Sequence, residues 1–475
     1  MKKFLLLLLL PACATIPKAE LGMTPTELAH WSQNLDWQKA GDEAIQVLSH
    51  YLQVDTSNPP GNETLGAQFL ANLLQKEGIE SQITEFAPGR GSLIARLKGT
   101  GQEKPLCLLS HIDVVPADAR YWQQDRPPFS GLIDAEGTIW GRGALDMKGL
   151  GALEVETLIW LKRLKIPLKR DVILLAVADE EVDNRGMQHV VDKHWAEIGC
   201  SQVVNEGGMG IRDPLAPGQT VFAISVAEKG LLWVKMIARG KAGHGSTPLP
   251  GRAPDRLLDA LARIRARHPE AEWQQPVREM LAAAGHDLGG LTGFVLKRPA
   301  LQTALAEGKL MANPGTRAAM IDTVNVTGFG GAQQPNVVPA EVWAQLDCRL
   351  LPGHKPLQLL EELQTLAADS QIRFEVIHAA EANQSPWDDP FYLALARHAV
   401  EGQPHAVVGP VLSPGYTDSL LLRPLGVHAY GFVPFATTQD EAATMHGENE
   451  RVSSANVRMG LKILFSAVVD VVALP

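Results

Sequence analysis

The chain has 475 residues, more than one hydrophobic core usually organises, so at least two domains are expected. Its 45% hydrophobic and 20% charged residues indicate an ordinary globular protein and argue against a disordered or fibrous one. The formal net charge of -10, without a strong basic run, argues against nucleic acid or an anionic membrane surface as the main partner.

The N-terminus departs from this average composition. Two lysines precede an apolar run over residues 4–10, which Pro11-Ala12-Cys13 follow. This order is typical of a secretory signal peptide, and the run is too short to remain as a membrane-spanning helix. Residues 10–13 also resemble a bacterial lipobox, although Pro11 is unusual there; the buried start of a helix is the alternative. We therefore expect a signal peptide or lipoprotein leader over residues 1–13, with Cys13 as a candidate lipid anchor. Export to a bacterial periplasm or its membrane would follow.

Alternating helical and strand patterns follow a polar tether expected over residues 14–26. Alternation of this kind predicts an α/β domain with a largely parallel sheet, here over residues 27–227. Helices are expected over residues 41–54, 63–78, 148–165 and 185–198, and strands over residues 92–97, 105–109 and 172–177.

The order of elements changes from about residue 228. Strand, helix, two strands, helix and strand are expected at 231–238, 255–267, 322–327, 341–346, 357–368 and 372–377, with a less regular stretch over residues 269–320. This β-α-β-β-α-β order is the ferredoxin-like arrangement, so residues 228–380 are predicted to be a domain inserted into the first. Residues 381–475 return to α/β texture and end in a helix from Ser453.

The cysteines outside the leader show neither a disulfide framework nor a cysteine zinc site. Cys107, Cys200 and Cys348 are odd in number and lack CxxC spacing. Cys107 and Cys348 lie in apolar, strand-like stretches, so we expect them to be small buried thiols.

Polar residues that could carry chemistry follow two of the predicted strands. His111 lies just past an apolar strand, where functional groups of open α/β sheets gather. Asp113 could accept the second ring N–H of a metal-bound His111. Taken alone, a His-x-Asp pattern is weak evidence for a metal site and favours a surface histidine instead. The run Asp179-Glu180-Glu181 follows the strand at 172–177, and adjacent carboxylates repel unless a cation offsets their charge; a solvated loop is the alternative.

Three further residues complete the candidate set. Asp146 lies in a glycine-flanked turn before a helix, where it could hold one metal on each oxygen or cap the helix. Glu206 closes an apolar stretch, and His446 lies far downstream. Together these histidines and carboxylates are of the kind that zinc accepts.

The motifs taken together resemble peptidase family twenty, the carboxypeptidase, aminoacylase, acetylornithine deacetylase and succinyl-diaminopimelate desuccinylase relatives. The resemblance covers nearly everything after the leader. It is strongest to carboxypeptidase S-like members, as two segments indicate: Asn58-Pro59-Pro60-Gly61 and the long stretch over residues 269–320. It implies a zinc-peptidase-like α/β catalytic domain with a central mixed, mostly parallel sheet. It also implies an inserted ferredoxin-like α+β lid or dimerisation domain. The motifs that carry it are Ser110-His111-Ile112-Asp113, Gly141-Arg142-Gly143-Ala144-Leu145-Asp146-Met147-Lys148-Gly149, Glu180-Glu181, Asn205-Glu206-Gly207 and His446-Gly447.

The resemblance also assigns roles to the metal-site residues. His111 and Glu206 would bind one metal, Glu181 and His446 the other, and Asp146 both. Glu180 resembles the general base, and Asp113 resembles the acid that orients His111. Two zinc ions per subunit are implied, although such ligands also suit cobalt or manganese.

Substrate-binding roles follow from the lid and from the tail of the chain. His244, in Ala242-Gly243-His244-Gly245-Ser246-Thr247-Pro248, resembles the lid histidine that polarises the scissile carbonyl, often from the neighbouring subunit. Asn336 and Arg349 resemble substrate-binding residues, and a guanidinium would favour a free substrate carboxylate. Gly415 and Thr417 lie in a segment where Pro414-Gly415-Tyr416-Thr417-Asp418 replaces the common Gly-Gly-Thr-Asp. Ser110 likewise stands where the family usually has Gly.

The expected activity is metal-dependent hydrolysis of amide bonds in small peptides, of carboxypeptidase or dipeptidase type, or in N-acyl amino acids. An N-carbamoyl amino acid hydrolase on the same scaffold is the alternative. An inactive exported peptide-binding protein would lack a ligand or the base, and none is missing. A lid histidine acting in trans would require a homodimer formed through the lid.

Overall fold

The central sheet is built on strands that are apolar on both faces. The computed structural model describes residues 35–474 except 215, 248 and 332, so the expected leader, Cys13 and the tether lie outside the described residues. β3 and β6 are buried at every position, as strands in the middle of a parallel sheet are. Within the described residues the sheet has nine strands: β1 (Ser81–Glu85), β2 (Gly91–Leu97), β3 (Leu106–His111), β6 (Val172–Val177), β7 (Gln202–Arg212), β8 (Thr220–Glu228), β15 (Asn383–Gln384), β16 (Ala406–Ser413) and β17 (His428–Thr437).

The strand order confirms the predicted mixed α/β fold. From one edge the order is β1-β2-β6-β3-β7-β17-β8-β15, and β16 pairs with β8. β6, β3, β7 and β17 are parallel neighbours, whereas β1 and β2 add antiparallel pairs at one side. The parallel centre places the carboxyl ends of β3, β6 and β7 at one edge of the sheet.

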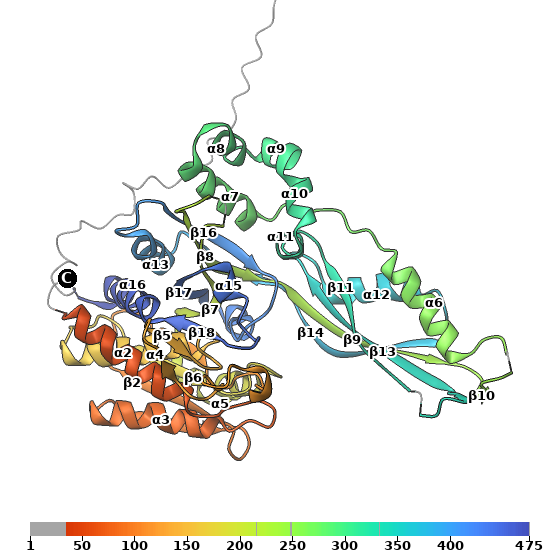
Figure 1. Cartoon of the computed structure of the whole chain (residues 1–475), viewed down its shortest axis with the longest axis horizontal. Helices are drawn as coiled ribbons and strands as arrows, with labels where there is room; N and C mark the ends of the chain where they lie inside the picture. The colour runs from red at the N-terminus through yellow and green to blue at the C-terminus, as the bar shows by residue number, and fades with distance from the viewer. Residues whose placement is uncertain (1–34, 215, 248, 332, 475) are drawn as a thin grey trace, which may run out of the picture.

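Helices cover both faces of this sheet (Figure 1). α2, α4 and α16 pack on the face that carries Leu108 and Leu174, and α5 packs on the opposite face against Leu109 and Leu175. The helices of this part are α2 (Trp37–Leu52), α3 (Glu63–Lys76), η1 (Ala119–Tyr121), α4 (Lys148–Arg163), α5 (Arg185–Ile198), α13 (Pro390–Val400), α14 (Ser419–Leu422), η3 (Arg423–Leu425), α15 (Gln439–Ala442) and α16 (Ser454–Val472). A separate three-stranded sheet consists of β4 (Leu132–Ile133), β5 (Thr138–Trp140) and β18 (Arg451–Ser453).

The prediction that Cys107 is a free thiol is wrong. Cys107 forms a disulfide with Cys200 across a Cα–Cα distance of 5.9 Å. β3 and β7 are parallel neighbours, and their register brings residue 200, just before β7, beside the start of β3. The two cysteines are 93 residues apart in sequence, so no local spacing motif could reveal the pair. Cys348 is buried and free as predicted, and burial raises the pKa of its thiol to about 12.

The second sheet has the expected ferredoxin-like order. Its strands run β11-β13-β9-β14, all antiparallel, with a hydrophobic core of their own beneath two helices. Figure 1 shows this lid extending away from the central sheet. Lys229 alone separates β8 of the central sheet from β9 of the lid. The limits of the inserted domain, residues 228–380, stay a prediction. The lid consists of β9 (Gly230–Arg239), β10 (Gly243–His244), α6 (Ala253–Arg265), β11 (Thr323–Gly330), β12 (Val337–Val338), β13 (Glu341–Leu350), α12 (Pro356–Ala367) and β14 (Ile372–Ala380).

The stretch expected to be less regular is a series of short helices. Glycine or proline separates several of them, at Gly289-Gly290, Pro299 and Pro314. α7 packs against the central sheet rather than on the lid, with Met280 against Gly409 of β16. The elements are α7 (Gln275–Leu288), α8 (Gly290–Leu296), α9 (Pro299–Leu301), η2 (Gln302–Ala306), α10 (Glu307–Ala312) and α11 (Pro314–Ala318). No helix in the described part of the chain is long and apolar enough to cross a membrane.

A fully buried carboxyl group in α4 makes stability depend on pH. Burial raises the pKa of Glu154 well above its usual range, and nearby Ser110 offsets only part of this effect. An unfolded glutamate ionises near pH 4.3, so above that pH ionisation stabilises the unfolded state while folded Glu154 stays protonated. Glu154→Gln is therefore expected to be more stable than the parent at pH 8, by roughly 1–3 kcal/mol, and the gain should shrink toward pH 4.

Chemical unfolding at pH 4, 6 and 8 would measure this difference. Glu361→Gln, which changes an exposed carboxylate on α12, is the matched control. A gain in stability independent of pH would show that the ionisation of Glu154 is not its origin.

Candidate metal centre

Three parallel strands deliver most of the candidate ligands to one edge of the sheet. His111 is the last residue of β3, the acidic run Asp179-Glu180-Glu181 follows β6, and Glu206 lies within β7. Carboxyl ends of adjacent parallel strands meet at the same edge, where open α/β sheets bind ligands. Asp146 arrives from the turn before α4, and His446 from the loop after α15.

The five predicted ligands form two halves that share Asp146. The Nε2 atom of His111 lies 3.0 Å from Asp146 Oδ1 and 3.5 Å from Glu206 Oε1. The Nε2 atom of His446 lies 2.9 Å from Asp146 Oδ2 and 3.3 Å from Glu181 Oε2. Each oxygen of Asp146 thus faces one histidine, and each histidine has one glutamate beside it, as expected of a carboxylate that bridges two metals.

The charges of the centre fit divalent cations. The carboxyl oxygen Oε1 of Glu181 is buried and lacks a hydrogen-bond partner within the described part of the chain. Ligand atoms of His111, Asp146 and Glu181 lie within 4.8 Å of one another, as do those of His111, Glu180 and Glu206. Two imidazoles, four carboxylates and an unsatisfied buried oxygen make a donor set that zinc and similar ions accept.

The burial and crowding of these charged groups also shift their pKa values. Burial, and then the nearby Glu206 charge, raise the pKa of Glu180 well above its usual range. Burial, and then the Asp146 charge, do the same to Glu206. Hydrogen bonds to Asp146 and Glu181 raise the pKa of His446 to about 10. Burial alone would raise the pKa of Asp146, but its hydrogen bonds to the two histidines lower it. The cluster therefore holds negative charge that only protons or metal cations neutralise.

Asp113 acts on the centre through different atoms than expected. The ring Nδ1 of His111 lies 2.9 Å from the backbone carbonyl oxygen of Asp113, whereas the nearer carboxylate oxygen is 3.7 Å away. The carboxylate instead accepts hydrogen bonds from the backbone amides of Glu180 and Glu181, both at 3.1 Å. Asp113 thus fixes the His111 ring through its carbonyl and the acidic loop through its side chain.

Glu450 is a positioning residue that the sequence did not reveal. Its buried carboxylate accepts hydrogen bonds from the backbone amides of Gly143, Leu145 and Asp146, at 2.8–3.2 Å. It also accepts from Arg142 at 2.6 Å, and Arg142 donates in turn to the carbonyl oxygen of His446. The pair therefore ties the turn of Asp146 to the loop of His446. An acid four residues after a ligand histidine is the only trace of this role in the sequence.

Asn58 and Arg90 complete the support of the acidic loop and were also missed. Asn58 Nδ2 donates to Asp113 and to Asp179, both at 2.9 Å. Arg90 bonds Asp179 at 2.5 Å and the buried Glu63 at 2.7 Å. In the sequence, Asn58-Pro59-Pro60-Gly61 is distinguished only by its similarity to carboxypeptidase S-like members, which assigns Asn58 no supporting role.

A cavity of about 500 Å³ opens directly onto the ligands and contains Arg349. The Nε and Nη2 atoms of Arg349 bond Asp347 at 2.7 and 3.1 Å, and its Nη1 is buried without a partner among the described residues. The guanidinium carbon lies 5.0 Å from the ring centre of Tyr416 and 5.9 Å from that of Trp233. Arg349 thus places a guanidinium in the wall of the cavity beside the metal ligands, flanked by two aromatic rings.

Gly415 and Thr417 also line this cavity. The hydroxyl of Thr417 accepts from Asn205 at 3.1 Å and donates to the buried Glu228 at 2.7 Å. Since its hydroxyl is engaged on both sides, Thr417 anchors the 414–418 loop beside the metal ligands.

His244 and Asn336 lie together but outside this cavity. His244 is exposed in β10, which pairs with β12, and the amide of Gly245 donates to the carbonyl of Asn336 at 2.8 Å. β10 lies at the far end of the lid in Figure 1, and neither residue lines the cavity. Within one chain the structure therefore brings together the metal ligands, Glu180 and Arg349, but not these two residues.

The sequence pattern of Peptidase family M20/M25/M40 matches residues 107–470. The chain belongs to this family. As an M20 protein it is a metal-dependent hydrolase of the metallopeptidase and amidohydrolase class.

Similar M20 proteins include aminoacylases and a fatty-acyl amino acid enzyme. Aminoacylase-1B of Rattus norvegicus is 28% identical over 445 residues, which cover 91% of this chain and 97% of the relative. The N-fatty-acyl-amino acid synthase/hydrolase PM20D1 of Homo sapiens is 28% identical over 373 residues, covering 77% of this chain and 74% of the relative.

Solved M20 structures share the fold. The metallo-carboxypeptidase Sso-CP2 of Sulfolobus solfataricus superposes with a TM-score of 0.68 at 21% identity, covering 90% of this chain and 98% of its own. The YXEP protein of Bacillus subtilis, described as a dinuclear metal binding peptidase, gives a TM-score of 0.55 at 14% identity, covering 92% and 99%.

Proposed function

We propose that this M20 protein is a two-zinc hydrolase of small peptides or N-acyl amino acids that carry a free carboxylate beside the cleaved amide bond. The observation that supports this most directly is the position of Arg349, a guanidinium that lines the same cavity as four of the predicted metal ligands. A guanidinium binds a carboxylate through charge-assisted hydrogen bonds, which would set the distance from the carboxylate to the scissile bond. The full-length similarity to aminoacylases supports the N-acyl substrates.

The chain supplies distinct residues for binding metal and for moving the proton. His111 and Glu206 would hold one ion, His446 and Glu181 the other, and Asp146 both. When bound, such ions act as Lewis acids toward the carbonyl and lower the pKa of water. Glu180 would accept the proton of the attacking water and deliver it to the leaving nitrogen. Its backbone amide is fixed by Asp113 at 3.1 Å, so its side chain starts from a defined position.

Zinc is the proposed ion, and export the proposed location. Histidine and carboxylate ligands suit zinc, although cobalt and manganese accept the same set.

The leader-like first 13 residues argue for export, and so does the Cys107–Cys200 disulfide, because disulfides persist mainly in oxidising compartments. Mass spectrometry of the mature N-terminus would test both export and lipidation of Cys13. An unprocessed Met1 on the native protein would contradict both.

The function is tested by hydrolysis of a mixed substrate panel with chelator-stripped and zinc-restored protein. The panel contains dipeptides, N-acyl amino acids, N-carbamoyl amino acids and a carboxamide analogue of each. Zinc-dependent release of amino acids from peptides or N-acyl substrates is expected. A preference for N-carbamoyl substrates would favour that hydrolase class instead. Absence of turnover despite stoichiometric zinc would contradict the proposed activity.

Arg349→Ala should act on recognition rather than on chemistry. Loss of a hydrogen bond to a charged partner is worth about 1.5–3 kcal/mol, so kcat/KM for free-carboxylate substrates should fall about 10- to 100-fold, mostly through KM. Carboxamide analogues, which lack the charge, should lose much less. Steady-state kinetics on paired substrates measures both. Equal losses on the two series would show that Arg349 does not bind the substrate carboxylate.

We further propose that His244 serves the cavity of a partner subunit in a lid-mediated homodimer. The exposed position of His244, far from its own cavity, supports action in trans. Mixing Glu180→Gln with His244→Ala is the sharpest test, because a mixed dimer would contain one cavity with both residues intact. Recovery of activity well above that of either variant is expected. Failure to recover activity although mixed dimers form would contradict action in trans.

A further inference from the structure

The position of Arg349 in the cavity limits where the rest of a bound substrate lies. In the proposed function its guanidinium binds the substrate carboxylate through charge-assisted hydrogen bonds. The α-carbon of the released amino acid is bonded directly to that carboxylate, and the amino-acid side chain branches from the α-carbon. This side chain must therefore lie against the groups that flank the guanidinium.

Two aromatic rings, which we call the aromatic wall, flank the guanidinium. Trp233 comes from β9 of the lid and Tyr416 from the loop between β16 and α14. The two ring centres lie 6.1 Å apart at an interplanar angle of 72°, edge to face. Both residues line the cavity and are only half-buried, so part of each ring is open to a ligand. Aromatic rings pack well on other aromatic rings and on apolar groups, so the wall favours such side chains.

The charged groups of the cavity have other roles. Among the described residues, the charged side chains that line it belong to the metal centre, to the proposed base or to Arg349. Burial, followed by the Glu180 charge, raises the pKa of Tyr416, so its phenol stays neutral. A charged substrate side chain would lose hydration beside the aromatic wall without gaining an ionic partner. The apolar side chains of the lining are Leu145, Val182, Met209, Trp233, Val433 and Met445.

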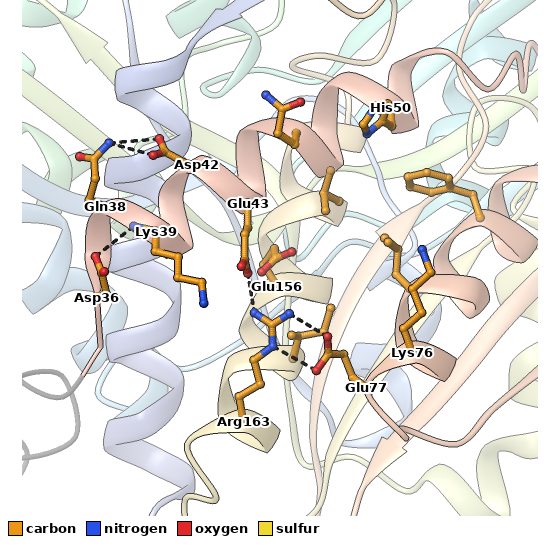
Figure 2. Close-up of a pocket in the computed structure, with 15 residues that line it drawn as sticks. Asp36, Gln38, Lys39, Asp42, Glu43, His50, Lys76, Glu77, Glu156 and Arg163 are labelled. Carbon is orange, nitrogen blue, oxygen red and sulfur yellow. Dashed lines mark hydrogen bonds and ion pairs between the residues drawn. The ribbon is translucent and has the colours of Figure 1, made fainter.

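A crevice of about 730 Å³ among α2, α3 and α4 does not offer another place for the substrate side chain (Figure 2). It shares no lining residue with the metal-centre cavity, so it cannot receive part of a small substrate bound at the metals. Its charged groups also pair within the chain: Arg163 bonds Glu77 at 2.7 and 3.0 Å, and Asp42 pairs with Arg458 at 2.6 Å.

On the basis of the proposed function, we infer that Tyr416 and Trp233 determine specificity for the released amino acid, whose side chain is aromatic or large and apolar. The side chain packs on the aromatic wall while Arg349 binds the carboxylate. Tyr416 stands in the loop where Gly415-Tyr416-Thr417-Asp418 replaces the common Gly-Gly-Thr-Asp, so this half of the wall is a feature of this chain.

Initial rates on the zinc-loaded full chain test this specificity. The substrates are the N-acetyl derivatives of L-phenylalanine, L-leucine, L-alanine, L-aspartate and L-lysine. The kcat/KM for N-acetyl-L-phenylalanine should exceed that for N-acetyl-L-alanine about 10- to 100-fold, because the larger side chain fills more of an apolar site. The two charged substrates should be poorer than the leucine derivative. Similar kcat/KM values across the series would overturn the inference and leave the proposed function intact.

Tyr416→Ala should remove most of this preference. Its kcat/KM for N-acetyl-L-phenylalanine should fall at least about tenfold, with a much smaller loss on N-acetyl-L-alanine. Tyr416→Phe keeps the ring and should keep the preference. Tyr121→Ala, which removes an exposed aromatic ring outside the cavity, is the control and should match the parent protein. Equal losses on both substrates in Tyr416→Ala would show that the ring only supports Arg349, and would overturn its role in specificity.

Binding of free amino acids separates this specificity from the proposed activity. Titration calorimetry on the zinc-loaded chain should show L-phenylalanine binding at least about tenfold more tightly than L-alanine, and Tyr416→Ala should remove the difference. This result without any turnover of the substrates would contradict the proposed function but support the side-chain site. Without turnover, equal binding of the two amino acids, or no binding of either, would overturn the side-chain site as well.

Discussion

Glu180→Gln should reduce turnover by about 10²- to 10⁴-fold while leaving both metals bound. A positioned general base contributes about that much to catalysis, and glutamine cannot accept the proton of the attacking water. Metal binding should survive, because the contact that shapes the loop is the backbone amide of Glu180 on Asp113, not its side chain. The neighbouring ligand Glu181 is held by the same carboxylate.

Elemental analysis and initial rates on the same preparation would separate the two effects. Asp183→Asn is the matched control, since Asp183 is an exposed acid on the same loop. It should retain turnover. Loss of metal from Glu180→Gln would show that Glu180 is a metal ligand rather than a base. This alternative arises because the Glu180 carboxylate lies close to ligand atoms of His111 and Glu206.

Elements with a strong local signal were predicted with correct bounds. The predicted strand at 172–177 is β6, because six consecutive apolar residues suit a strand buried on both faces. The predicted helix at 185–198 is α5, which Gly199 ends in a left-handed conformation. The edge that gathers His111, Glu181 and Glu206 follows from the same reasoning, because neighbouring parallel strands end together.

Features that depend on register between distant segments were not predictable from local patterns. The Cys107–Cys200 pair needs β3 and β7 to be neighbours, which neither segment encodes alone. Glu450 looks like one acid among several until the loop folds its carboxylate under three backbone amides. Trp233 reaches the cavity from the lid, beside Tyr416 from the tail of the chain.

The substrate-binding residues divide in a way that the motifs alone could not show. Arg349 lies in the long strand β13, which reaches back to the cavity. His244 lies in the short strand β10 and Asn336 just before its partner β12, at the other end of the lid. The strands of the lid thus separate two sets of residues that the motifs assign to one substrate. A second subunit is the simplest way to reunite them, and the mixed-dimer experiment tests it.

Asp146→Ala should remove most of the bound metal and reduce turnover by at least about 10³-fold. Among the residues that the structure describes, Asp146 alone lies within hydrogen-bonding distance of both ligand histidines, at 3.0 and 2.9 Å, so its loss affects both halves of the centre. Lewis-acid activation is worth several kcal/mol, which corresponds to a loss of this size. The fold should persist, because Glu450 holds the turn through backbone amides that alanine retains.

Metal content, circular dichroism and rates would be measured together, with Asp125→Ala, an exposed acid, as the control. A folded variant without metal is the expected result, and it would show that Asp146 serves binding rather than folding. Retention of one tightly bound ion with partial turnover would mean that the two halves are independent. In that case His111 with Glu206, or His446 with Glu181, would suffice to hold a metal, and Asp146 could not be the shared ligand.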